Sequence, residues 1–144
     1  MNILSDRSVF KIRGEESFDF LQSVVTADIS PLKKGKAVAS CLLSPQGRIL
    51  YDFLLYPELN QTDFSCLVDC HHSEKFELIK KLTMYKLRSK VLISDSDALC
   101  ILINQKKIDG FFSDPRHPKL PFRKIIEKDI SDNDFPEDND FQSK

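Results

Sequence analysis

The stretch from residue 20 to residue 56 constrains the fold more than any other part of the chain. It contains the end of a helical pattern, a turn with Pro31, a strand of small residues, a turn with Gly47 and a second strand. The second strand carries Tyr51 and Asp52 among apolar neighbours. A carboxylate in such a strand is either a structural exception or part of a binding site.

Hydrophobic periodicity sets the order of the elements. Residues 8–12 alternate between apolar and polar, which predicts a half-buried strand, and the spacing of Phe18, Leu21 and Val24 predicts an amphipathic helix. Further strands are predicted at residues 36–43, 48–56, 64–68, 90–94, 98–103 and 122–126, and a second helix at residues 72–85 with Phe76, Ile79, Leu82 and Met84 along its apolar side. This order predicts an α+β fold, an antiparallel sheet with helices packed on one face and a split βαβ, ferredoxin-like character.

The charge balance limits the partners that the chain can have. Its 144 residues include 21 basic and 22 acidic side chains, whereas a nucleic-acid-binding face needs a clustered excess of Lys and Arg. The first residues show no charged segment followed by an apolar core, and no stretch approaches the roughly 20 apolar residues of a membrane span. We therefore expect a soluble, cytoplasmic protein that binds neither nucleic acid nor membrane.

The cysteines sit inside apolar runs, which favours buried free thiols over disulfides. A metal site is the alternative at Cys66-x3-Cys70-His71-His72, which holds two thiols and two imidazoles within seven residues. However, a strand over residues 64–69 would point Cys66 to one of its faces and leave Cys70 in the following turn. No second pair of ligands occurs elsewhere in the sequence, so we predict no metal site here.

Several short motifs give the chain a resemblance to a known family. They are FLQ at residues 20–22, VTADI at 25–29, GKA at 35–37, LSPQGRI at 43–49, LTMYKLRSKV at 82–91 and DPRHP at 114–118. With these motifs the chain resembles the folate-binding proteins of the YgfZ type, which share their fold with the glycine cleavage T protein, an aminomethyltransferase. The fold implied is the N-terminal part of the T-protein folate-binding fold.

The resemblance implies a protein that binds tetrahydrofolate or a derivative and supports iron–sulfur cluster enzymes or their assembly factors. The alternative is an aminomethyltransferase, which transfers a one-carbon unit to tetrahydrofolate. In that branch an Asp-Asp pair follows the glycine turn and its first member is catalytic; the pair falls here on Tyr51 and Asp52. Because the first aspartate is replaced, we expect no catalytic residue and favour binding over transfer. A truncated, non-catalytic scaffold or interaction module is the third hypothesis.

A folate wall follows from strand alternation combined with the resemblance. Tyr51, Phe53 and Leu55 share one side of their strand and would stack against a flat pterin ring. On the next strand, Leu67 completes the candidate wall and Asp69 is its candidate acceptor for pterin N–H groups. The alternative is that the aromatic residues are ordinary core.

Three further polar residues are secondary candidates. Asp52 would face away from the wall and pair with a base such as Arg48. Arg88 belongs to a small basic cluster with Lys86 and Lys90, which would meet the glutamate tail of a folate or else be a solvated turn.

The resemblance also divides the chain into segments. Residues 1–96 are predicted to form an α+β domain of the folate-binding type, and residues 97–127 to begin a second segment of the family fold. Residues 128–144 are acidic and poor in apolar side chains, which predicts a disordered tail. The family's downstream signature, Lys-Gly-Cys-Tyr-x-Gly-Gln-Glu, is absent from the sequence, so we expect a portion of a longer protein or a truncated product.

Overall fold

A computed structural model describes residues 1–128 of the chain. Its strands are β1 (Asn2–Leu4), β2 (Arg7–Arg13), β3 (Val38–Leu43), β4 (Ile49–Pro57), β5 (Ser65–His71), β6 (Leu92–Asp95), β7 (Leu99–Asn104) and β8 (Phe122–Glu127). Its helices are α1 (Ser17–Val24) and α2 (Lys75–Lys86), with short 3-10 turns η1 (Ser30–Lys34) and η2 (His72–Glu74). Of the predicted acidic tail, residues 129–144 lie outside the described residues.

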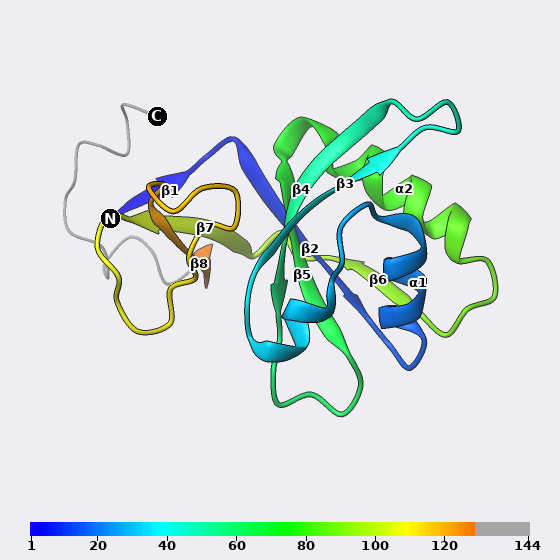
Figure 1. Ribbon diagram of the computed structural model, residues 1–144, viewed down its shortest axis with the longest axis horizontal. Helices are drawn as coiled ribbons and strands as arrows, with labels where there is room; N and C mark the ends of the chain where they lie inside the picture. The colour runs from blue at the N-terminus through cyan, green and yellow to red at the C-terminus, as the bar shows by residue number, and fades with distance from the viewer. Residues whose placement is uncertain (129–144) are drawn as a thin grey trace.

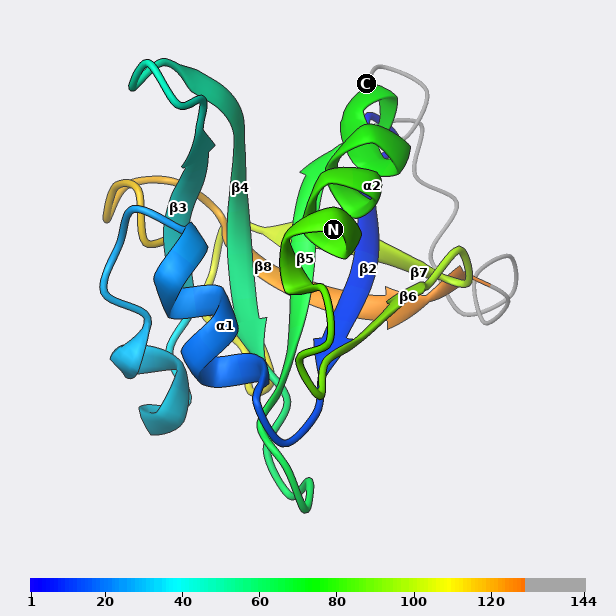
Figure 2. The ribbon, with the colours of Figure 1, turned by 90° about the vertical axis from the view of Figure 1, so that its right-hand side faces the viewer.

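The strands form two antiparallel sheets. The larger has five strands in the order β3-β4-β5-β2-β6, and the smaller has three in the order β1-β7-β8. Both helices cover one face of the larger sheet, and the smaller sheet lies against the other face (Figures 1 and 2). The predicted α+β class and antiparallel pairing are confirmed, and the smaller sheet is an additional layer.

The main core fills the space between the larger sheet and the helices. Alternation along each strand sends every second side chain to this side, so Phe53 and Leu55 from β4 and Val68 from β5 meet Leu21 of α1 and Leu78 of α2. A smaller core lies on the opposite face. It contains Val9, Leu54, Tyr56, Leu67 and Ile101, with partly buried side chains from β1, β7 and β8 packed around them. The larger sheet is therefore apolar on both faces.

The helix α2 buries part of the side that its sequence predicts, since Leu82 is buried and Ile79 packs against the main core. Leu78 and Leu82 are buried, but Phe76 is 67% exposed and Met84 also lies at the surface. Lys75 takes a buried position at the start of the helix because its ammonium group reaches Asp95 and Asp97 at 2.7 and 2.6 Å. This pair of carboxylates compensates the burial of the lysine stem.

The predicted segments 1–96 and 97–127 are joined in the structure. β1 at the start of the chain pairs with β7, with Ile3 opposite Leu102, and both segments contribute to the smaller core. None of the described helices is long and apolar enough to cross a membrane.

Candidate functional site

The first three residues of the predicted folate wall lie on the helix-covered face of β4. Phe53 and Leu55 are 3% and 0% exposed and belong to the main core. Tyr51 packs against that core but remains half-buried near the edge. Burial raises the pKa of the Tyr51 phenol, and the nearby Glu77 and Glu74 raise it further. Of these three side chains, Tyr51 alone has a surface that a ligand can contact.

Leu67 and Asp69 lie on the opposite face of the larger sheet. Leu67 belongs to the smaller core, and Asp69 stands opposite Leu54 in the β4–β5 register. The structure therefore brings Leu67 and Asp69 together with each other but separates them from Tyr51, Phe53 and Leu55 by the thickness of the sheet. The five residues do not line one surface.

Asp69 is the centre of a buried polar network between the two sheets. Its side chain is 0% exposed and accepts a hydrogen bond from Arg7 Nε at 2.7 Å, from Tyr56 Oη at 2.9 Å and from Arg123 Nη2 at 2.9 Å. Arg123 Nε also donates to Tyr56 Oη at 2.8 Å. Burial, followed by the charge of Asp69, raises the pKa of Tyr56 well above its usual value, so the phenol stays protonated and donates.

The network continues to the loop before β8. Arg123 Nη1 lies 3.6 Å from Asp114 Oδ2, and Arg116 donates to both carboxylate oxygens of Asp114. Burial of Asp114 works against its ionisation, but the Arg116 hydrogen bonds outweigh this and lower the pKa of Asp114. Each buried carboxylate thus has two guanidinium partners. Asp69 is buried and accepts hydrogen bonds from three side chains, so it joins the sheets and is not exposed to a pterin.

The sequence did not single out most of this network. Asp114 and Arg116 belong to the DPRHP motif and were visible, whereas Arg7, Tyr56 and Arg123 carried no local signal. Their partners are 13 to 67 residues away along the chain, so a single-sequence pattern cannot pair them.

The secondary candidates lie at the surface. Asp52 is paired with His71, whose Nε2 lies 3.8 Å from Asp52 Oδ1, rather than with Arg48. Arg48 and Arg88 are exposed, and neither forms an ion pair within residues 1–128. In the basic cluster, Lys90 pairs with Glu15 at 3.6 Å.

The Cys66, Cys70, His71 and His72 side chains do not converge. Both thiols are buried in the main core; burial raises the pKa of the Cys66 thiol well above its usual value and that of Cys70 to about 12. His72 is hydrogen-bonded to Ser8, whereas His71 turns toward Asp52. The four side chains therefore offer no common site for a metal ion.

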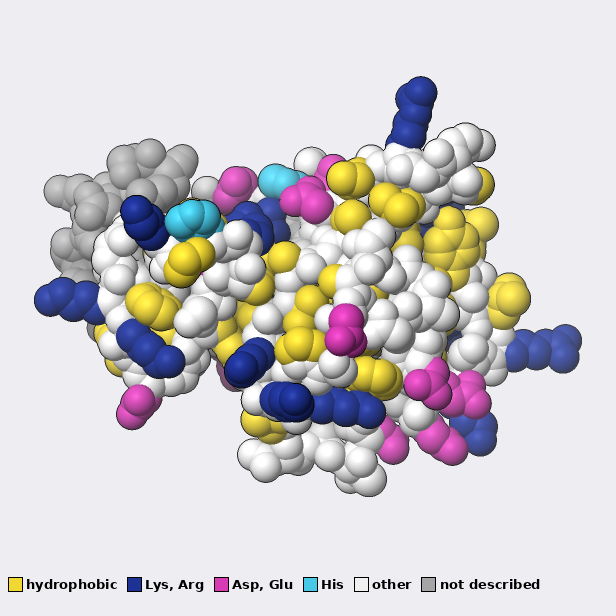
Figure 3. Space-filling view, viewed as in Figure 1, with side chains coloured by type: hydrophobic (Ala, Val, Ile, Leu, Met, Phe, Trp, Pro, Cys, Tyr) yellow, Lys and Arg dark blue, Asp and Glu magenta, His cyan; other side chains and the backbone are white. Residues whose placement is uncertain are grey.

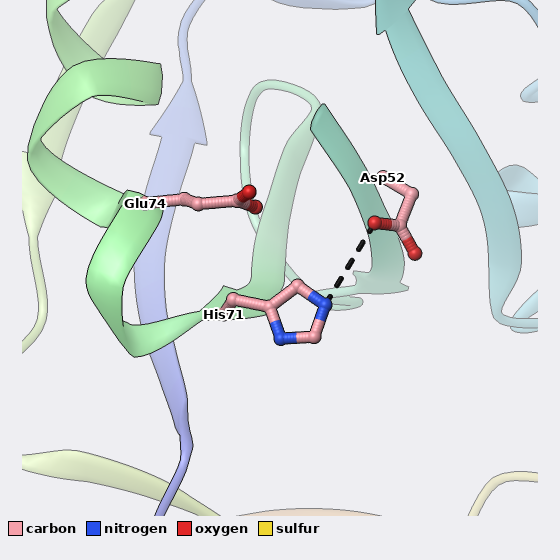
Figure 4. Close-up of side chains that lie close together, drawn as sticks. All are labelled: Asp52, His71 and Glu74. Carbon is pink, nitrogen blue, oxygen red and sulfur yellow. Dashed lines mark ion pairs between the residues drawn. The ribbon is translucent and has the colours of Figure 1, made fainter. Parts of the chain in front are cut away.

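A different cluster forms at the end of β5, beside Asp52 of β4. Asp52, His71 and Glu74 each present one ligating atom, and these atoms all lie within 4.8 Å of one another. Figure 4 shows the carboxylates of Asp52 and Glu74 on either side of the His71 ring. In the sequence, Asp52 was a secondary candidate and His71 belonged to the rejected metal motif, but Glu74 carried no signal.

A hollow of about 560 Å³ opens where the smaller sheet meets the larger one. It is lined on one side by Pro31, Gly35, Lys36 and Ala37, and on the other by Lys107, Phe111, Phe112, Ser113 and Pro115. Figure 3 shows hydrophobic and basic side chains gathered near this junction. The size suits a small organic ligand, with aromatic rings for contact and two ammonium groups for an anion.

The fold resembles that of an aminomethyltransferase. The crystal structure of the glycine cleavage system aminomethyltransferase T from Bartonella henselae superposes with a TM-score of 0.61 over 71% of this chain and 27% of that one, at 17% identity. An aminomethyltransferase of Chlorobium phaeobacteroides is 35% identical over 66 residues, or 46% of this chain and 18% of the relative. No protein-family model matches the chain. The chain is therefore similar to the N-terminal portion of proteins of the glycine cleavage T protein and folate-binding superfamily.

Within that superfamily, two relatives match most of the chain. The iron-sulfur cluster assembly factor IBA57 homolog, mitochondrial, of Pyricularia oryzae is 29% identical across 88% of this chain and 35% of its own length. The mouse iron-sulfur cluster assembly factor IBA57, mitochondrial, is 28% identical across 88% of this chain and 42% of its own length. The chain thus spans less than half the length of either relative. Because both relatives are mitochondrial proteins, they contradict the expected cytoplasmic location.

Proposed function

We propose that this chain forms the N-terminal portion of a mitochondrial protein that supports iron–sulfur cluster assembly and binds a tetrahydrofolate derivative. The observation that carries the proposal is the extent of the similarity, since both assembly factors match across 88% of the chain. The aminomethyltransferase match, in contrast, covers 46% of it.

Tyr51 favours binding over one-carbon transfer. The resemblance places the catalytic carboxylate of the aminomethyltransferases at this position, where the chain has a phenol. A carboxylate is ionised at neutral pH and a phenol is not, so Tyr51 cannot replace the missing negative charge. Asp52, the next residue, lies on the other side of the strand by alternation.

The hollow between the segment before β3 and the loop before β8 is the best place in the described part of the chain for the folate ring. Phe111 and Phe112 supply apolar contact for a flat heterocycle. Lys36 and Lys107 stand at the same hollow and suit the carboxylates of the glutamate tail. The predicted wall offers less, because four of its five residues are buried among other side chains.

Calorimetric titration with 5-formyltetrahydrofolate tests the folate site. Charge reversal by Lys36→Glu should weaken binding by about tenfold, because a carboxylate at this site would repel the glutamate tail. Lys34→Glu is the matched control, since Lys34 is exposed two residues away and does not line the hollow. Equal affinity in the two variants would remove the folate from this hollow, and absence of binding by the full-length protein would remove the folate from the proposal.

The assembly function requires a separate test in cells. Depletion of the full-length protein should lower the activity of mitochondrial [4Fe–4S] enzymes, and re-expression should restore it. An assay of aminomethyl transfer, with the unmodified protein and with Tyr51→Asp, addresses the aminomethyltransferase alternative, which the Chlorobium relative favours. Turnover of an aminomethyl donor by either form would revive that alternative, whereas normal iron–sulfur enzyme activity after depletion would end the leading one.

A further inference from the structure

Asp52, His71 and Glu74 come from three consecutive elements, and the fold alone brings them together. β4 and β5 pair up to Phe53 opposite Cys70, so the next residues on each strand, Asp52 and His71, are cross-strand neighbours. The chain then turns through η2, which ends at Glu74 and brings its carboxylate close to Asp52 and His71. Figure 4 shows all three side chains directed toward a shared space.

Glu74 carries an unsatisfied hydrogen-bond acceptor. Its Oε1 atom is buried and has no hydrogen-bond partner among the described residues. A buried polar atom without a partner is rare, and in a native structure it often marks an absent ion or water. The neighbouring Lys75 is not available, because its ammonium group is occupied by Asp95 and Asp97.

The pair formed by Asp52 and His71 does not satisfy the cluster by itself. Their side chains are 63% and 45% exposed and 3.8 Å apart, which makes a weak surface contact. The three side chains together offer two carboxylates and one imidazole. Within residues 1–128, no lysine or arginine forms an ion pair with any of the three, so the cluster lacks a cation.

We propose that Asp52, His71 and Glu74 bind one divalent transition-metal ion at the end of β5. One imidazole nitrogen and two carboxylate oxygens form a ligand set that suits Zn²⁺, Fe²⁺ or Mn²⁺, whereas Mg²⁺ and Ca²⁺ prefer oxygen ligands alone.

The geometry requires little movement. Bonds of about 2.0–2.2 Å from a metal place its ligand atoms roughly 3.5 Å apart, and the three atoms here lie within 4.8 Å of one another. The exposed side chains of Asp52 and His71 can close the difference by rotation. With three protein ligands, two of them exposed, the metal ion also keeps a coordination position for water or another ligand.

The site is distinct from the proposed folate hollow. None of its three residues lines that hollow, which lies at the junction with the smaller sheet. Metal binding and folate binding can therefore be measured independently in the same chain.

Isothermal titration of the reduced chain with ZnCl₂ tests the proposal, with MnCl₂ and MgCl₂ titrated in parallel. We expect one Zn²⁺ ion per chain, weaker binding of Mn²⁺ and no heat with Mg²⁺. His71→Ala and Glu74→Gln should each weaken Zn²⁺ binding by about tenfold or more. Circular dichroism should show that both variants remain folded, because neither side chain belongs to the hydrophobic cores.

Matched controls separate this site from other histidines and acids. His72→Ala removes the adjacent imidazole, and Glu77→Gln removes a carboxylate one turn further along α2; neither change should alter the affinity. Zn²⁺ binding that survives in both His71→Ala and Glu74→Gln would overturn the proposal. Loss of binding in Cys41→Ser, or absence of binding of any transition metal to the unmodified chain, would overturn it as well.

Discussion

Asp69 and Asp52 lie on neighbouring strands and, by alternation, on the same face of the larger sheet, yet their surroundings are opposite. Asp69 is buried and held by Arg7, Tyr56 and Arg123. Asp52 is 63% exposed, with His71 as its ion-pair partner. A buried carboxylate with three donors is placed to hold the structure together, whereas an exposed carboxylate is open to a ligand. Burial and partners, rather than residue type, separate the two roles.

The comparison predicts its largest effect at Asp69. Asp69→Asn removes the negative charge, leaves Arg7 buried without a carboxylate and leaves Arg123 with Asp114 at 3.6 Å, which should lower the free energy of unfolding by about 3–5 kcal/mol. Urea denaturation followed by circular dichroism measures the change. A loss below about 1 kcal/mol would mean that water reaches the network and that the interior is not sealed.

A buried and an exposed apolar residue of β4, Leu54 and Ile49, extend the same comparison to packing. Leu54→Ala empties a position that is 1% exposed in the smaller core and should cost about 3 kcal/mol of unfolding free energy. Ile49→Ala, on the same strand but 68% exposed, should cost less than about 0.5 kcal/mol. Equal losses in urea denaturation would show that β4 is covered along its whole length.

Acid should destabilise the buried network more than the surface. Because the folded pKa of Asp114 lies below its usual value of 3.8, the folded state binds its proton less readily than the unfolded state. The resulting stability is present above about pH 4 and is lost as the pH falls through the folded pKa. Asp114→Asn should therefore flatten the fall in stability below pH 4, by about 2 kcal/mol.

Asp97 provides the matched surface case for that acid titration. The hydrogen bond from Lys75 lowers the pKa of Asp97, so its contribution has the same sign and the same pH window. Because Asp97 is exposed, solvent screens the interaction and Asp97→Asn should change the acid profile much less. Urea midpoints between pH 2.5 and 6 compare the two variants, and identical profiles would contradict the difference in burial.

The smallest effect is expected in the cluster of Asp52, His71 and Glu74. Without metal, Asp52→Asn should change the free energy of unfolding by less than about 0.5 kcal/mol, because the ion pair with His71 is solvent-exposed. Excess Zn²⁺ should raise the melting temperature of the unmodified chain but not that of Asp52→Asn. A large loss of stability in the metal-free variant would make Asp52 a structural residue like Asp69.

Sequence periodicity predicted the elements of the larger sheet because their patterns are local. Alternation located β2, β4 and β5, and the turn at Gly47 identified the β3–β4 hairpin. The predicted apolar side of α2 was right for Leu82 and Ile79 but wrong for Phe76 and Met84, which are exposed. The smaller sheet was not foreseen, since β1 has only three residues and finds its partner at β7, almost a hundred residues later.

The candidate site was less accessible to sequence reasoning than the fold. Alternation correctly placed Tyr51, Phe53 and Leu55 on one side of β4, but it cannot say which side is covered by helices. Asp69 was chosen as a ligand acceptor, and the side chains that occupy it come from β2, β4 and β8. Such contacts depend on the tertiary arrangement, which a single sequence does not contain.

The contact between Arg123 and Asp69 spans 54 residues of sequence and therefore has a consequence for biosynthesis. A ribosome that adds about 5–20 residues per second produces Arg123 roughly 3 to 11 seconds after Asp69. During that interval the nascent larger sheet has no smaller sheet against its second face, so its apolar side chains are open to chaperones or to unwanted association. The arrival of β8 is thus the step that ends this exposure and completes the interior.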